Sequence, residues 1–197
     1  TVMSLFSLLP FVFCCMTSFL RFTIVFSLLK TAMGVQVPPA IVTIGLCMIL
    51  TFYTMGGVFE KMYERGSVPY QKSGNMLVAI EEGSKPLKEF MLKQTRESDL
   101  AFFVELKRKA PPKSPDELTI WEIAPAYILS ELKVAFEIGF VVFVPFIVLD
   151  LVVANILLAL GMFMLSPTII SLPFKLLIFI AVDGWALIVQ GLVQSYN

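Results

Sequence analysis

The chain has 197 residues, no formal net charge at pH 7 and no histidine. Hydrophobic residues make up 57% of the chain and charged residues only 15%, whereas a soluble domain is usually about half apolar and a quarter charged. This balance favours a membrane protein and argues against a nucleic-acid-binding surface, and the absence of histidine removes the commonest general base and metal ligand.

Charge divides the chain into three parts. Residues 60–133 hold 24 of the 30 charged residues, twelve of each sign, and the rest of the chain holds six. We therefore predict a first apolar helical hairpin over 1–59, a charged, water-facing helical insert over 60–133 and a second apolar hairpin over 134–197. The expected fold class is all-α, because the sequence shows no convincing strand alternation.

The first part of the chain contains two apolar runs. These runs are Leu5–Leu29 and Ala40–Phe59, and a turn with two prolines at 34–39 joins them. Arg21 lies inside the first run, and Lys30 lies at its end, where a long cation can reach the lipid headgroups. The pattern predicts a helical hairpin.

The insert begins with signals for helices. Asn75 is a capping residue for a short segment over Met76–Glu82, and Gly83 is expected to stop that segment. Ser84 then caps a longer amphipathic helix, whose apolar residues recur at three- and four-residue spacing. Thr95 is a point at which this helix restarts.

The end of the insert carries a second capping signal. The proline-rich stretch 110–115 predicts a loop, and Thr119 followed by Glu122 forms a capping box. A helix is therefore expected to begin there and to enter the second apolar part.

The second apolar part consists of two long stretches, Val134–Leu165 and Thr168–Val193. Pro145 interrupts the first stretch and is expected to kink or break its helix. Together the two stretches carry only four charged residues: Glu137, Asp150, Lys175 and Asp183. An ionised side chain in the bilayer costs about 3 kcal/mol on insertion scales, so these groups need partners, water or a functional reason.

The three acidic residues in these stretches, Glu137, Asp150 and Asp183, allow two interpretations. They can form a proton or cation path, because ionisable residues within a membrane are often functional. They can also be structural, each paired with Lys175, with Arg21, with a neighbouring subunit or with free backbone groups near a proline. The prolines of the two halves do not correspond as in many transporters, which favours the structural interpretation.

The loop at 161–167 is uncharged and contains Met162, Phe163 and Met164. Flexible methionine side chains can conform to changing surfaces, and a ring of such loops would form a deformable apolar seal. The alternative is that these side chains merely fill the core of a helical turn.

The sequence gives no indication of catalysis. The cysteines are Cys14, Cys15 and Cys47, all in apolar runs without CxxC spacing, and we expect them to be small buried hydrophobic residues. No nucleotide-binding or nucleophile motif is present. We therefore expect no enzyme activity, no cofactor and no metal site.

Several longer motifs are similar to those of the FliP/SctR family of export-gate membrane proteins. Two lie near the end of the chain, at Thr168–Leu176 and Val182–Trp185. The others occur in the family's order along the chain: Gly34–Pro39, Phe90–Arg96, Leu129–Leu132, Ala135–Phe140 and Leu160–Met162. The resemblance covers essentially the whole chain.

This resemblance implies a pore-forming core subunit of the type III secretion export apparatus, which conducts unfolded protein substrates across the bacterial inner membrane. It implies a homo-oligomer of about five copies, joined by small membrane proteins that are FliQ/SctS-like and FliR/SctT-like. The charged insert would lie on the periplasmic side, at the base of a flagellum or injectisome. The sequence leans only slightly towards the flagellar branch.

The resemblance also assigns roles to particular residues. Met162, Phe163 and Met164 would form the pore gasket, although Phe163 stands where the family commonly has methionine. Glu131 and Lys175 would meet as a structural charge pair, with Arg21, Glu137, Asp150 and Asp183 as other buried charges. Close helix packing is expected at small residues: Gly139, Ala154, Ala159, Gly184 and Gly191.

Two other functions compete with this interpretation. One is an ion-coupled transporter or proton channel built on the acidic residues of the apolar stretches. The other is a membrane scaffold without a pore. The stoichiometry of the solubilised particle separates them, because a gate requires several copies around an axis.

Overall fold

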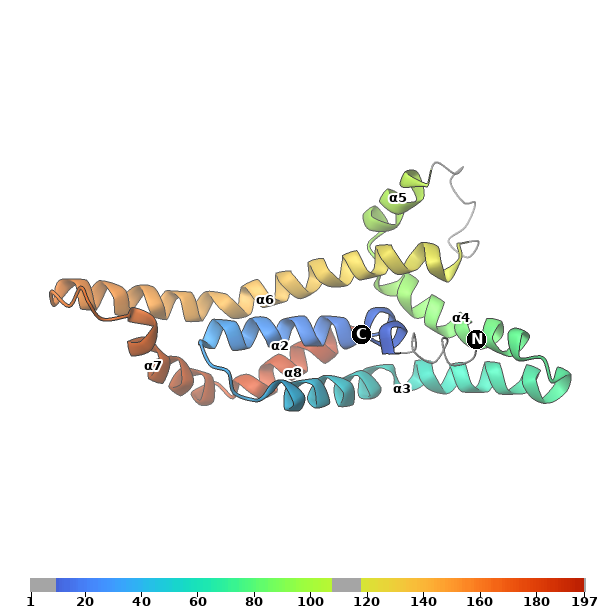
Figure 1. The fold of residues 1–197 in the computed structure, drawn as a ribbon, viewed down its shortest axis with the longest axis horizontal. Coiled ribbons are helices and arrows are strands. Elements are labelled where there is room, and N and C mark those ends of the chain that lie inside the picture. The colour runs from blue at the N-terminus through green and yellow to red at the C-terminus, as the bar shows by residue number, and fades with distance from the viewer. Residues whose placement is uncertain (1–9, 108–117, 197) are drawn as a thin grey trace. The chain divides into compact units, whose positions relative to one another are not determined.

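The computed structural model describes residues 10–107 and 118–196, apart from the side chains of residues 72 and 73. Within these ranges every regular element is a helix, which confirms the all-α fold class. After a helical segment at Pro10–Met16, Figure 1 shows α2 (Phe19–Met33), α3 (Ala40–Ser73), α4 (Met76–Gln94), α5 (Glu97–Leu106), α6 (Ile120–Ala159), α7 (Pro167–Ala181) and α8 (Gly184–Gln194).

The chain forms two compact units, each built from segments that are distant in sequence. The first unit comprises Thr1–Arg21 with Cys47–Val134, and the second comprises Phe22–Leu46 with Ala135–Asn197. The predicted boundaries after residues 59 and 133 concern a different property, namely which parts lie in lipid and which in water. That division stays a prediction.

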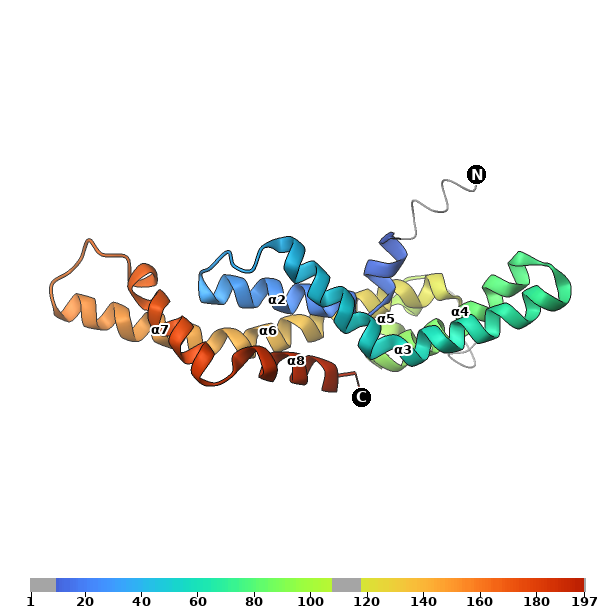
Figure 2. The same cartoon turned by 90° about the horizontal axis from the view of Figure 1, so that it is seen from below.

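In the first unit, α3 and α4 form a tight antiparallel hairpin (Figure 2). A Cβ atom on Gly83 would lie 3.3 Å from the carbonyl oxygen of Met62 and 3.4 Å from the Cα of Gly66. The two backbones therefore nearly touch at a pair of facing glycines. The predicted helix stop at Gly83 is wrong: α4 continues to Gln94, because this glycine serves the close approach of two helices.

The ends of α4 follow the capping signals in part. The side chain of Asn75 accepts a hydrogen bond from the backbone N–H of Leu77 at 3.0 Å, as expected of an N-cap. Ser84 does not begin a new helix; its hydroxyl donates to the carbonyl of Glu81 within α4. The helix ends at Thr95, and α5 starts two residues later at Glu97.

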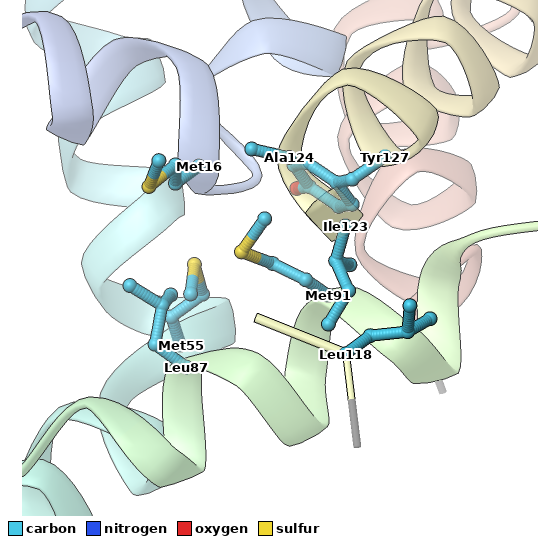
Figure 3. Close-up of a cluster of buried hydrophobic side chains, with 8 residues drawn as sticks. All are labelled: Met16, Met55, Leu87, Met91, Leu118, Ile123, Ala124 and Tyr127. Atoms are coloured by element: carbon cyan, nitrogen blue, oxygen red, sulfur yellow. The ribbon is translucent and has the colours of Figure 1, made fainter. Parts of the chain in front are cut away.

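The first unit closes around a core that is rich in methionine. Figure 3 shows the buried residues of this cluster, which come from the first described segment, α3, α4, the residues just before α6 and the start of α6: Met16, Met55, Leu87, Met91, Leu118, Ile123, Ala124 and Tyr127. Unbranched thioether side chains fill irregular spaces between helices that cross at different angles. This core holds the base of the α3–α4 hairpin against α6.

The capping box at the start of α6 forms as the sequence predicts. The backbone N–H of Thr119 donates to Oε2 of Glu122 at 2.9 Å, and Lys107 Nζ lies 3.0 Å from the other carboxylate oxygen. From there α6 runs for 40 residues without interruption. The expected break at Pro145 is therefore wrong, and the helix passes through this residue, as apolar helices with packed neighbours often do. A kink at Pro145 stays a prediction.

In the second unit, α2, α6, α7 and α8 pack through small and aromatic residues. A Cβ atom on Gly139 of α6 would lie 2.2 Å from Cδ1 of Leu28 on α2. The rings of Phe22 and Tyr196 meet edge to face at 5.7 Å. The expectation of a close helix contact at Gly139 is thus confirmed.

The last apolar stretch is not one helix. The chain bends by 63° between α7 and α8, at Asp183, whose φ of 51° is left-handed. Gly184 follows directly, and a Cβ atom there would lie 2.3 Å from the ring of Phe179. Gly184 therefore makes the expected close contact, whereas Gly191 has open space around it in the isolated chain.

Two helices are long and apolar enough to cross a membrane, over Ala40–Gln71 and Ile120–Ala159. The number rises to four if each bent pair of helices counts as one span. Only 28% and 17% of the apolar windows of the two long helices are buried within the chain. These helices therefore leave most of their apolar surface for lipid or other subunits.

Candidate functional site

A buried ion pair joins the two chain segments that make up the first unit. Arg21 Nε donates to Oε2 of Glu131 at 2.9 Å, and Nη2 donates to Oε1 at 2.5 Å. The exposed fractions of the two side chains are 2% and 0%. The planar guanidinium fork matches the carboxylate in two places, which is the geometry that best offsets the cost of removing both charges from water.

A second polar cluster ties α5 to α6 in the first unit. The carboxylate of Asp99, which is almost fully buried, accepts hydrogen bonds from Lys133 and, at 2.8 Å, from the hydroxyl of Ser130. The same Ser130 hydroxyl accepts from the backbone N–H of Arg96 at 3.0 Å. Burial alone would raise the pKa of Asp99, but the hydrogen bonds from Lys133 and Ser130 outweigh it and hold this pKa below its ordinary value.

A third cluster lies in the second unit and joins α6, α7 and the end of α2. Lys175 Nζ donates to Oδ2 of Asp150 at 2.7 Å and to the carbonyl oxygen of Ala32 at 3.1 Å. The hydroxyl of Ser171, one turn before Lys175, donates to the other oxygen of Asp150. The side chain of Lys175 is only 2% exposed, so these partners replace the water that its ammonium group has lost.

The structure thus gives the two residues of the expected Glu131–Lys175 pair other partners within the chain. Glu131 binds Arg21, and Lys175 binds Asp150. A contact between Glu131 and Lys175 of different subunits stays a prediction. Of the other charges expected to be buried, Arg21 is buried and Asp150 is half-buried, but Glu137 and Asp183 are exposed on the isolated chain.

The gasket residues lie on an exposed loop between α6 and α7. Gly161, with a φ of 75°, ends α6: its N–H donates to Leu158, and the N–H of Met162 donates to Leu157. Phe163 is 76% exposed and Met164 is fully exposed. This loop therefore presents apolar side chains that nothing within the described chain covers.

Sequence reasoning missed the Asp99 cluster and the contribution of Ser171. Asp99 and Ser130 lie 31 residues apart, so no local pattern pairs them. Ser171 and Lys175 occupy one helix face at i and i+4 spacing, and this spacing was an available signal that both face the same carboxylate.

None of these clusters has the composition of a metal centre. Within residues 10–107 and 118–196, no group of three or more histidine, cysteine, aspartate or glutamate side chains could hold a metal ion. The three cysteines are free, with Cys47 buried and Cys14 and Cys15 half-buried. The arrangement suits structural pairing of charges around an apolar helical assembly.

Comparisons with known proteins give a consistent result. The sequence profile of the FliP family matches residues 2–192. The chain is 48% identical over 190 residues to the flagellar biosynthetic protein FliP of Pectobacterium carotovorum. The aligned region covers 95% of this chain and 74% of the relative. The chain is 47% identical to FliP of Buchnera aphidicola from Acyrthosiphon pisum, and the aligned region covers 50% of that relative.

A relative from a virulence system also matches. The chain is 42% identical over 204 residues to the Yop proteins translocation protein R of Yersinia pestis. The aligned region covers 100% of this chain and 94% of the relative.

Proposed function

The chain belongs to the FliP family, and from that premise we propose that it is a pore-forming core subunit of a type III secretion export gate, without enzyme activity. Its relatives are named as flagellar biosynthetic and Yop translocation proteins. The proposed cargo is unfolded protein, which crosses the bacterial inner membrane through an axial pore. The higher identity to a flagellar relative, 48% against 42% for the Yop translocation protein, favours a flagellar system.

The assembly we propose contains about five copies of this chain with FliQ/SctS-like and FliR/SctT-like membrane proteins. The single observation that carries this proposal is the unburied apolar surface of α3 and α6 in a chain whose family match is nearly complete. Gly191 of α8 has open space around it in the isolated chain, so a neighbouring subunit can pack closely against α8 there. The charged insert over 60–133 would then lie on the periplasmic side.

The competing transporter hypothesis loses support at Asp150. A carboxylate on a proton path should exchange protons with water, but Lys175 and Ser171 occupy both oxygens of Asp150. The other two acidic residues that a proton path could use, Glu137 and Asp183, lie at the surface of the isolated chain. We therefore regard the acidic residues as structural.

The stoichiometry of the particle tests this proposal. The chain should be expressed with its neighbouring membrane-protein genes, extracted in mild detergent and weighed by native mass spectrometry. We expect a discrete particle with several copies of this chain, and averaged images that show an axial symmetry or spiral. A stable, monodisperse monomer or dimer, with or without the partner proteins, would contradict the proposal.

A further inference from the structure

An open cleft of about 860 Å³ lies between the C-terminal half of α2 and the beginning of α3, entirely within the second unit. The turn that joins these helices, visible in Figure 2, contributes Gly34, Val35 and Gln36 to the lining of the cleft. The cleft has a polar side, to which Ser27, Lys30 and Gln36 contribute, and an apolar side that includes Ala40 and Ile44. Its volume is typical of a site for a small molecule.

The polar side of the cleft holds hydrogen-bond donors that the described chain does not use. No hydrogen bond or ion pair involves the side chains of Ser27, Lys30 or Gln36 within residues 10–107 and 118–196. Together they offer an ammonium group, an amide and a hydroxyl. Lys30 is half-buried, so its charge has lost part of its water without gaining a partner.

The usual structural role of a lysine at this position is already filled. Lysines near the C-terminus of a helix often bind its last free carbonyls. Here the backbone does so: the N–H of Gly34 donates to Thr31 at 3.1 Å, and the N–H of Val35 donates to Lys30 at 3.3 Å. The ammonium group of Lys30 is therefore available to another ligand.

The charge of the cleft selects the ligand class. Among the described residues that line the cleft, Lys30 is the only charged one, and none is a carboxylate. A cation with neighbouring amide and hydroxyl donors complements an anion with several acceptor oxygens, and a phosphate has this form. The apolar wall beside the donors then suits hydrocarbon attached to that phosphate.

The position of the cleft favours a lipid over a free anion. The α3 segment able to cross a membrane starts at Ala40, directly in the cleft wall, so the donors lie at the end of an apolar span, at the depth of lipid headgroups. We propose that this cleft binds one anionic phospholipid, with its phosphate on Lys30, Gln36 and Ser27 and its first acyl carbons against Ala40 and Ile44.

Native mass spectrometry of the full chain in its purified detergent-solubilised assembly, titrated with phosphatidylglycerol, tests this site. We expect saturable binding of one lipid per copy of the chain, at least tenfold tighter than binding of zwitterionic phosphatidylcholine. Lys30→Gln should weaken phosphatidylglycerol binding at least tenfold, whereas Lys30→Arg should retain it. Gln36→Ala gives a second, milder test that does not remove a charge.

The matched control is Lys61→Gln, which removes an exposed cation further along α3 and should leave binding unchanged. Equal binding of the two lipids, or wild-type binding by Lys30→Gln, would overturn the proposal. So would full competition by equimolar inorganic phosphate, which would indicate a free-anion site. Loss of a partner protein from Lys30→Gln, without any lipid binding by the wild-type assembly, would assign the cleft to that partner instead.

Discussion

Arg21 and Glu131 lie 110 residues apart in the sequence and meet through two hydrogen bonds in a site closed to water. Removing one member of such a pair leaves the other charge buried without compensation. The pair therefore matters less for the stability it adds than for the penalty that follows when one partner is lost.

At this scale we predict that Glu131→Gln destabilises the first unit by about 3–5 kcal/mol and impairs assembly. Thermal unfolding of the purified protein in detergent measures the loss. The exchanged pair, Arg21→Glu with Glu131→Arg, should recover part of it. Arg65→Gln is the control, because its partner Glu89 is largely exposed and surface pairs contribute at most about 1 kcal/mol. Equal effects of Glu131→Gln and Arg65→Gln would contradict this account.

Asp99 gives a prediction with a defined pH dependence. Its folded-state pKa is lowered from the ordinary value of 3.8, so its hydrogen bonds stabilise the fold fully above about pH 4. That contribution disappears as the pH falls through the lower, folded-state pKa. Hydrogen exchange should therefore show α5 losing protection between pH 4 and pH 2 in the wild type.

In Asp99→Asn the same helix should be less protected at pH 7, and its protection should change little between pH 4 and pH 2. Glu89→Gln is a suitable comparison, since Glu89 lies at the surface of the neighbouring helix α4. A wild-type acid profile in Asp99→Asn would show that another group controls the docking of α5.

At the scale of helices, the hairpin of α3 and α4 depends on the facing glycines Gly66 and Gly83. We predict that Gly83→Leu separates the two helices and costs about 1–3 kcal/mol, because the atoms nearest to its Cβ belong to backbone and cannot move aside. Gly57→Leu, on α3 with nothing within 4 Å of its Cβ, should change stability by less than about 0.5 kcal/mol. Chemical unfolding measures the free energy of unfolding of both variants. Equal losses in Gly83→Leu and Gly57→Leu would contradict the view that Gly83 is needed for the close approach of α3 and α4.

In these helices the sequence alone predicts the capping residues but not the role of Gly83. Asn75 and Glu122 act over two or three residues, so their capping roles follow from local spacing. Gly83 could not be interpreted in this way, because a glycine that ends a helix and one that admits a neighbouring helix look identical in a single sequence. The sequence did offer Lys175 as one partner for Asp150, and the two side chains do pair. It did not indicate that Arg21 pairs with Glu131, because that choice depends on packing between helices that are distant in the chain.

For the whole molecule, the family motifs predicted the function class that composition could not. Composition indicated apolar helices and a charged insert, which are shared by transporters, scaffolds and gates. The structure adds exposed apolar faces on the long helices and an uncovered loop at Phe163 and Met164. These surfaces make most sense in an assembly, where several copies of the loop could meet around an axis.

We propose that the loop of residues 161–167 closes a pore when no substrate passes. A pore for unfolded protein must be sealed at rest, and flexible apolar side chains can seal it while still yielding to varied substrates. We predict that replacing Met162, Phe163 and Met164 together by glycine leaves assembly and export intact but lets ions through.

The most direct measurement is the ion permeability of vesicles that carry the assembled complex, wild type or variant. We expect a rapid loss of an imposed ion gradient with the triple glycine variant and a tight membrane with the wild type. Met76→Gly should also be tight, since it removes an exposed methionine from the insert and not from the loop. A triple glycine variant that assembles normally and holds the gradient as well as the wild type would contradict the claim.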